Sequence, residues 1–211
     1  MNGPEFQRSD ERVQVASGDV NDPGLRRRVS QVVWAFRDCF TLEGDFVECG
    51  TGRGSMMSAG LQSLDGWNTS GKRLFLFDTF EPLRINPDTG DNDPARGLHD
   101  KYASSMEAVV ENFGEWKNVN IVKERIPKKL PSAGIGKVAF IHSDLNHSTA
   151  ERDALRYFWP KIVNGGVVLF DDDATSTTQN DTMNSLAAEF GVRILTTGSA
   201  QGITLKPYET N

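Results

Sequence analysis

Acidic side chains gather in two short segments of the chain, each directly after a run of apolar residues. One segment is Asp-Leu-Asn-His at 144–147, and the other is Asp-Asp-Asp at 171–173. Carboxylates crowded at one place repel one another, and a divalent cation among them relieves that repulsion. Carboxylate and amide oxygens without a paired thiol suit a hard ion such as Mg²⁺. We therefore predict a cation site with the ligands Asp144, Asp171 and Asp172. A solvated acidic turn is the alternative, and a helix-capping role is favoured for Asp173.

A glycine-rich loop forms a second candidate site. Residues 48–55 read Glu-Cys-Gly-Thr-Gly-Arg-Gly-Ser, between an apolar run and a helical pattern. Glycines at such a junction let the backbone turn sharply and approach a ligand closely. A dinucleotide site prefers G-x-G-x-x-G, whose last glycine would fall at Ser55. This disfavours NAD without excluding it. The predicted cofactor contacts in this loop are Glu48, Gly50, Thr51, Gly52, Gly54 and Ser55.

A third candidate is the acid that ends the next apolar run. Asp78, followed by Thr79, is placed to accept hydrogen bonds from ribose hydroxyls, which is the usual role of an acid at this position. A turn or capping aspartate is the alternative. We include Asp78 and Thr79 among the predicted cofactor contacts.

The elements that must position these residues alternate between strands and helices. Apolar runs and helical periodicity predict strands at 45–49, 73–77, 119–122, 137–141, 167–170, 192–196 and 202–205, and helices at 22–40, 55–64, 104–113, 150–159 and 178–190. Such alternation predicts an α/β fold: a Rossmann-like, doubly wound, mostly parallel seven-stranded sheet with helices on both faces. The last two strands should pair as an antiparallel hairpin. Ligands of such sheets bind beyond the carboxyl ends of the strands, where the candidate residues fall.

Two segments stand apart from this pattern. Residues 1–20 are polar and lack an apolar period, so we expect a flexible N-terminal arm before a single domain at 21–211. Residues 80–103 hold three prolines, two glycines and few aliphatics, so we expect a lid-like insertion.

Composition limits the partners more than the chemistry. The chain has 211 residues and a net charge of −6, which argues weakly against nucleic acid or an anionic membrane as the main partner. Two cysteines predict no disulfide framework and a reducing, cytoplasmic location. No apolar run reaches the length of a membrane span. A small-molecule acceptor is the expected partner, and the apolar first helix makes a homo-oligomer plausible.

Several motifs together resemble a known family. They are Gly-Asp-Phe-Val-Glu-Cys-Gly at 44–50, Phe-Asp-Thr-Phe-Glu at 77–81, the stretch 157–166 and the two acidic segments. Over about residues 44–173 the chain resembles the macrocin/mycinamicin-type (TylF-like) metal-dependent sugar O-methyltransferases. The loop also resembles the first motif of class I S-adenosylmethionine methyltransferases. The resemblance implies S-adenosylmethionine as methyl donor, Mg²⁺ on the three aspartates, and a hydroxyl of a sugar, polyol or phenol as acceptor.

The resemblance also implies a general base just after the first metal ligand, Asp144. Some members carry a histidine three residues after it, and others an acid two residues after it. Here these positions are His147 and Asn146, and an amide cannot act as a base, so His147 is the predicted base. A surface histidine is the alternative, and His142 is expected in the core or behind the site. Two other functions stay open: an NAD-dependent oxidoreductase, and a non-catalytic S-adenosylmethionine-binding protein.

Overall fold

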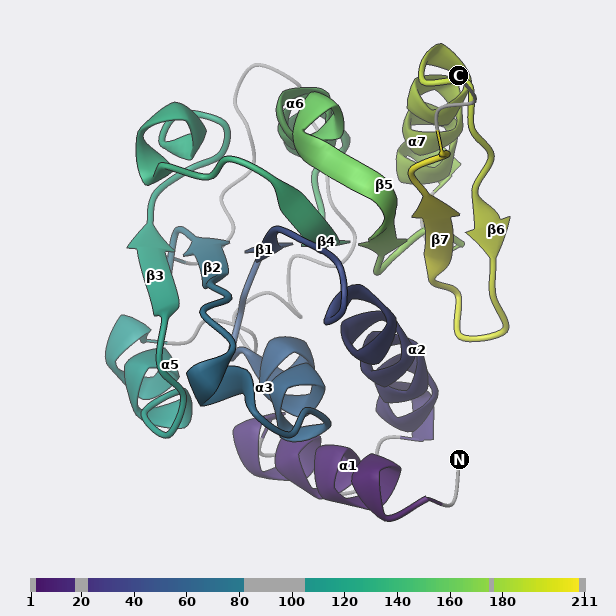
Figure 1. Cartoon of the computed structure of the whole chain (residues 1–211). Helices are drawn as coiled ribbons and strands as arrows, with labels where there is room; N and C mark the ends of the chain where they lie inside the picture. The colour runs from purple at the N-terminus through teal and green to yellow at the C-terminus, as the bar shows by residue number, and fades with distance from the viewer. Residues whose placement is uncertain (1–2, 18–22, 82–104, 175–176, 209–211) are drawn as a thin grey trace.

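The computed structural model describes residues 3–17, 23–81, 105–174 and 177–208. Its strands form one sheet in the order β3-β2-β1-β4-β5-β7-β6 (Figure 1). Their bounds are β1 (Asp45–Cys49), β2 (Leu74–Asp78), β3 (Val119–Lys123), β4 (Val138–Ser143), β5 (Ile162–Phe170), β6 (Leu195–Thr196) and β7 (Gly202–Leu205). The first five strands are parallel, and β7 runs antiparallel to both β5 and β6. The prediction of a mostly parallel sheet with a C-terminal hairpin is confirmed.

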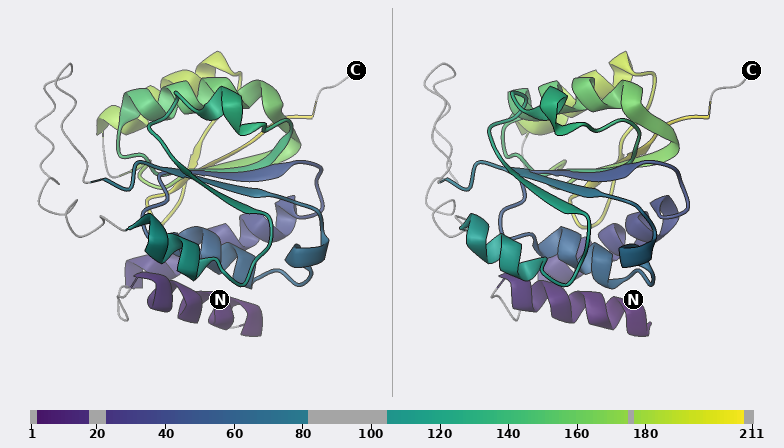
Figure 2. Two further views of the ribbon diagram at one scale, coloured as in Figure 1. Left: turned by 90° about the vertical axis from the view of Figure 1, so that its left-hand side faces the viewer. Right: turned by 60° about the vertical axis from the view of Figure 1, so that its left-hand side comes forward.

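Helices cover both faces of the sheet (Figure 2). On one face lie α2 (Pro23–Cys39), α3 (Ser55–Gln62) and α5 (Met106–Asn112), and on the other lie α6 (Ser148–Phe158) and α7 (Thr177–Glu189). Three short 3₁₀ segments connect elements: η1 (Trp67–Thr69), η2 (Leu130–Ala133) and η3 (Trp159–Lys161). Within the described ranges, no helix is both long and apolar enough to cross a membrane.

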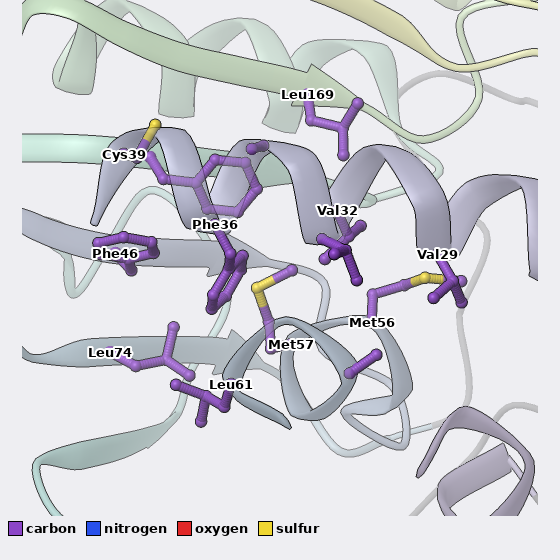
Figure 3. Close-up of a cluster of buried hydrophobic side chains, with 14 of the residues drawn as sticks. Val29, Val32, Phe36, Cys39, Phe46, Met56, Met57, Leu61, Leu74 and Leu169 are labelled. Atoms are coloured by element: carbon purple, nitrogen blue, oxygen red, sulfur yellow. The ribbon is translucent and has the colours of Figure 1, made fainter. Parts of the chain in front are cut away.

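The core beneath α2 shows why that helix forms where its sequence pattern indicates. Val29, Val32 and Phe36 recur at helical spacing and are fully buried. They point from α2 toward the strands and α3 (Figure 3). The Phe36 ring lies 4.9 Å from the ring of Phe46 on β1, centroid to centroid. This packing fixes α2 across the sheet, and α2 in turn carries residues that reach the site described below.

The expectation of a flexible arm over residues 1–20 is wrong for most of its length. Residues Pro4–Ser17 form the helix α1, which packs outside α3 and against α2 (Figure 2). Its inward face is Phe6, Ser9 and Val13, at positions i, i+3 and i+7. The buried serine interrupts the apolar stripe, which is why the helix lacks an evident hydrophobic period in the sequence.

The buried face of α1 yields a stability prediction. Val13 is 1% exposed, so Val13→Ala should lower the free energy of unfolding by about 1–2 kcal/mol through lost burial and an unfilled gap. Val15 on the same helix is 74% exposed, so Val15→Ala is the matched control and should change little. Urea unfolding of both variants measures the difference. Equal effects of the two substitutions would show that α1 does not pack on the domain in solution.

Two further expectations concern segment boundaries. The sequence predicts that a strand begins at 167, but β5 already begins at Ile162 and includes Gly165 and Gly166. The pairing of β4 with β5 shifts register there. A Cβ on Gly166 would lie 3.0 Å from the carbonyl oxygen of Ala139, so a glycine is needed within the irregular strand.

The lid-like insertion predicted at 80–103 lies outside the described residues, apart from Phe80 and Glu81.

Candidate functional site

The carboxyl ends of β1, β4 and β5 meet at one edge of the sheet. The backbone N–H of Asp144 donates to the carbonyl of Cys49 at 2.8 Å, and that of Asp171 donates to the carbonyl of Ser143 at 3.0 Å. The sheet order reverses between β1 and β4, so this edge is the topological switch point at which α/β proteins bind ligands. The glycine-rich loop and the two acidic segments therefore lie side by side.

The three predicted metal ligands are brought together at this edge. One carboxylate oxygen from each of Asp144, Asp171 and Asp172 lies within 4.8 Å of the others. Burial and the neighbouring carboxylate of Asp171 raise the pKa of Asp144 well above its usual range. Burial acts in the same direction on Asp171, but His142 and Arg28 hold the pKa of Asp171 below its ordinary value. The cluster thus carries strongly interacting charges, as a cation site would.

Asp171 is contacted by polar side chains from three separate parts of the chain. The amide nitrogen of Gln201, beside β7, donates to Asp171 Oδ1 at 2.8 Å. His142 Nε2 on β4 lies 3.5 Å from the same oxygen. The guanidinium of Arg28 on α2 contacts the other oxygen, Oδ2, through Nη1. Asp171 is 4% exposed, so these contacts fix its carboxylate in one orientation.

His142 also joins the acidic cluster to the strand that precedes the glycine loop. Its Nδ1 lies 3.0 Å from Glu48 Oε1, and both side chains are buried. Burial acts to lower the pKa of His142, but Asp171 and Glu48 outweigh it and raise that pKa to about 10. Burial raises the pKa of Glu48 to about 7 against the opposing effect of His142. His142 is thus in the core behind the site, as the sequence predicts.

The three glycines of the loop differ in what a side chain at each position would meet. Gly50 has φ of 89°, and a Cβ there would lie 1.8 Å from the carbonyl oxygen of Asp144, so its absence of a side chain lets the loop touch the acidic segment. Gly54, with φ of 75°, packs against the ring of Phe113. Gly52 has φ of 51°, yet no atom of the described residues lies within 4 Å of the position that a Cβ would take there. Of these three glycines, Gly52 is the one at which a Cβ would meet no atom of the described residues.

The other predicted cofactor contacts lie in the glycine loop or in the turn after β2. Both carboxylate oxygens of Asp78 accept backbone N–H groups, from Gly52 at 2.7 Å and from Phe80 at 2.8 Å. Asp78 thus ties the glycine loop to the turn after β2, and each oxygen keeps a second lone pair for a hydroxyl donor. Thr79 Oγ1 accepts from the N–H of Glu81 at 3.3 Å in the same turn. Thr51 is buried and Ser55 begins α3.

His147 forms the N-cap of α6, where its Nδ1 accepts the backbone N–H of Ala150 at 3.4 Å. A neutral imidazole has one acceptor nitrogen, so in this geometry the ring proton is on Nε2.

Asn146 has a positive φ of 51° and donates to Asp144 Oδ1 at 3.3 Å. Asp173 does not join the cluster, because it accepts hydrogen bonds from Thr196 and Asn180. The capping role expected for Asp173 is thus replaced by contacts to β6 and α7.

Glu151 is a buried acid on α6 close to the cluster. Its Oε1 accepts the backbone N–H of Leu145 at 3.2 Å and the amide of Gln179 at 3.4 Å, so it supports the segment that follows Asp144. Burial raises the pKa of Glu151 to about 8, the hydrogen bond from Leu145 opposes this, and Asp172 adds to it. Nothing in the local sequence pattern marked this glutamate.

The raised pKa of Glu151 predicts that the stability of the protein depends on pH. Between the ordinary pKa of a glutamate and about 8, the folded chain keeps a proton on Glu151 that the unfolded chain has released, so the free energy of unfolding falls as pH rises through this window. Glu151→Gln should remove about 1–3 kcal/mol of that fall between roughly pH 5 and pH 9. Urea unfolding across this range measures it, with the exposed Glu107→Gln as control. Parallel curves for Glu151→Gln and the unsubstituted chain would contradict the assignment.

Comparison with known proteins shows the family of the chain. The family model for macrocin O-methyltransferase (TylF) matches residues 25–192, which is more than half of the chain. The chain belongs to the TylF family. The matched range includes the glycine loop, both acidic segments and most of α2, so the site lies within the part of the chain that defines the family.

Two relatives of this TylF-family chain have described activities. One is an 8-demethyl-8-(2,3-dimethoxy-alpha-L-rhamnosyl)-tetracenomycin-C 4'-O-methyltransferase from Streptomyces olivaceus, 26% identical over 157 residues. The other is a demethyldecarbamoylnovobiocin O-methyltransferase from Streptomyces niveus, 26% identical over 163 residues. Each match covers 71% of this chain and 60% of the relative, so the chain spans about three fifths of their length.

Solved structures share the fold of the TylF-family chain. The O-methyltransferase NovP superposes with a TM-score of 0.81 over 97% of this chain and 100% of that chain, at 18% identity. CalS11, a calicheamicin methyltransferase, gives a TM-score of 0.66 over 97% of this chain and 94% of that chain, at 16% identity. The prediction of a Rossmann-like fold is confirmed by these likenesses.

Proposed function

We propose that this protein is an S-adenosylmethionine-dependent O-methyltransferase that acts on a hydroxyl of a sugar or similar polyol in a small natural product. One observation carries the proposal: a carboxylate cluster suited to a divalent cation lies against a glycine-rich loop at the switch point of the sheet. Two relatives support the class of acceptor: one is named as a 4'-O-methyltransferase of a rhamnosyl-tetracenomycin, and the other as an O-methyltransferase of demethyldecarbamoylnovobiocin.

The residues around the loop fit a cationic, ribose-containing donor. A Cβ on Gly52 would meet no atom of the described residues, and Asp78, which accepts the N–H of Gly52, has lone pairs for ribose hydroxyls. Glu48 has a buried oxygen, Oε2, without a hydrogen-bond partner among the described residues. The amino and sulfonium groups of S-adenosylmethionine are cationic, so a carboxylate behind the loop favours that donor over an anionic pyrophosphate.

The acidic cluster fits a hard divalent cation by its donor chemistry. Its three ligand groups are all carboxylates, with no cysteine among them, and oxygen ligands of this kind suit Mg²⁺. Asp144, Asp171 and Asp172 would hold the ion. A bound cation of this type lowers the pKa of a coordinated hydroxyl and fixes its direction.

The protein contributes to the reaction mainly by positioning the donor and the acceptor. Methyl transfer is an in-line displacement, in which the acceptor oxygen forms a bond to the methyl carbon as the bond from that carbon to sulfur breaks. Holding the acceptor in line can be worth about 7–11 kcal/mol. Loop and acidic cluster touch at Gly50, so donor and acceptor sites are held at a fixed separation. The acceptor proton leaves to a base, for which His147 is our candidate. To accept that proton, His147 has to release the backbone N–H of Ala150 from Nδ1, because a neutral imidazole has one acceptor nitrogen.

The role of His147 can be separated from its capping role by two substitutions. Asparagine is a good N-cap but no base, so His147→Asn should retain stability and lose at least about tenfold in turnover. His147→Ala should lose the same activity and also about 1 kcal/mol of stability. Steady-state methyl transfer and urea unfolding measure the two effects, and affinity for S-adenosylhomocysteine should not change. Full turnover by His147→Asn would show that the imidazole only caps α6.

Two titrations and one assay test the proposal as a whole. Calorimetry should show binding of S-adenosylhomocysteine and not of NAD; binding of NAD alone would favour the oxidoreductase alternative. Transfer of a labelled methyl group should then be measured over a panel of glycosides and catechols, with Mg²⁺ and with EDTA. Cofactor binding without transfer to any acceptor would favour the non-catalytic alternative. Activity that survives EDTA would remove the metal from the proposal and leave the methyltransferase.

A further inference from the structure

Arg28 places a positive charge among the predicted metal ligands. It lies on the second turn of α2, and its side chain is 24% exposed. Nη1 contacts Asp171 Oδ2, and Nη2 lies 3.6 Å from Asp172 Oδ1. One guanidinium therefore spans two of the three carboxylates that the proposed function assigns to Mg²⁺.

The geometry around Asp171 leaves a metal little choice of oxygen. Oδ1 already accepts a hydrogen bond from Gln201 at 2.8 Å and faces His142 at 3.5 Å. Oδ2 is the oxygen that Arg28 contacts. A Mg²⁺ ion requires its ligand oxygens at about 2.0–2.1 Å in near-octahedral geometry. It would thus need the oxygen of Asp171 that the guanidinium contacts.

We propose that Arg28 is a tethered cation that competes with the divalent metal for Asp171 and Asp172. The proposal rests on the metal site of the proposed function. Arginine stays charged at any pH that the protein meets, so its competition cannot be relieved by deprotonation. Two cations sharing one carboxylate pair at a few ångströms repel strongly in a partly buried site. A bound metal ion would therefore weaken the contacts of Arg28 with these carboxylates, and Arg28 would weaken the binding of the ion.

The helix that carries Arg28, α2, also contacts the C-terminal hairpin of β6 and β7. Gln31, one turn after Arg28, donates from Nε2 to Thr197 Oγ1 at 2.9 Å. The same hairpin region carries Gln201, which orients Asp171. Metal affinity is thus set in part by a helix that supplies no ligand to the ion.

Mg²⁺ binding to the full chain, without donor or acceptor, tests this inference. Calorimetric titration should show that Arg28→Gln binds Mg²⁺ at least about tenfold more tightly than the unsubstituted chain, because the competing charge is gone. Arg27→Gln is the matched control, since it removes the same charge from an exposed neighbouring position. In EDTA, Arg28→Gln should also melt at a lower temperature, and added Mg²⁺ should raise its melting temperature more than that of the control.

Any other result of the Mg²⁺ titrations would contradict competition between Arg28 and the metal ion. Unchanged affinity, or the same change as in Arg27→Gln, would show that Arg28 does not compete. Weaker binding would show that Arg28 orients the carboxylates for the ion. Both results would leave the proposed methyltransferase intact, whereas absence of Mg²⁺ binding in all three proteins would remove this inference together with the metal site. If Arg28→Gln does not fold, Arg28→Met keeps the packing of the stem and must show the same tightening.

Discussion

Asp171→Asn should lower methyl transfer by roughly 100-fold or more, the largest loss that we expect from a change of one functional group. The amide keeps the size of the side chain but removes the charge that a cation would need. It also leaves Arg28 and His142, which both face this carboxylate, with less negative charge. We therefore expect a loss of stability on the order of 3 kcal/mol as well, since removing one partner of a buried ion pair leaves the other uncompensated.

The matched control for this substitution is two residues away. Asp173 is also buried, but it accepts its hydrogen bonds from Thr196 and Asn180 and lies outside the cluster. Asp173→Asn should therefore weaken the fold without changing the response of the activity to Mg²⁺. Rates should be measured on folded protein at saturating donor, with Mg²⁺ and with EDTA. An Asp171→Asn enzyme as active as the unsubstituted one, and insensitive to EDTA, would contradict a role for this carboxylate in the reaction.

Gly50→Ala should have the largest effect on stability, a loss of about 3 kcal/mol or more. Two penalties combine, because φ is 89° and the new Cβ would lie 1.8 Å from the carbonyl oxygen of Asp144. Both atoms in this clash are held by the backbone, so the contact can be relieved only by parting the glycine loop from the acidic segment. Affinity for S-adenosylhomocysteine should fall with the stability.

Gly71 separates the two penalties. Its φ is 75°, but no atom of the described residues lies within 4 Å of where its Cβ would be, so Gly71→Ala carries the backbone penalty alone, about 1 kcal/mol. Urea unfolding of both variants gives the steric part by difference. If Gly50→Ala is no less stable than Gly71→Ala, the close approach of loop and acidic segment is not a feature of the protein in solution.

Local sequence patterns determined the elements whose side chains repeat regularly. The apolar spacing of Val29, Val32 and Phe36 was sufficient to predict α2, and the glycine loop marked the junction of β1 and α3. The helix α1 escaped prediction because Ser9 occupies the middle of its buried face. Periodicity reports burial only where the buried residues are apolar, so a buried serine hides a helix that tertiary packing stabilises.

The sequence by itself also determined which residues end the strands, and so that Asp144, Asp171 and Asp172 would lie at one edge of the sheet. Only the tertiary structure decided that β4 and β5 are neighbours, which brings these carboxylates within reach of one ion. It alone brought Arg28 and Gln201 to Asp171. The physical reason is that strand order and helix packing join residues far apart along the chain, while a sequence pattern records only the burial of each residue and its near neighbours.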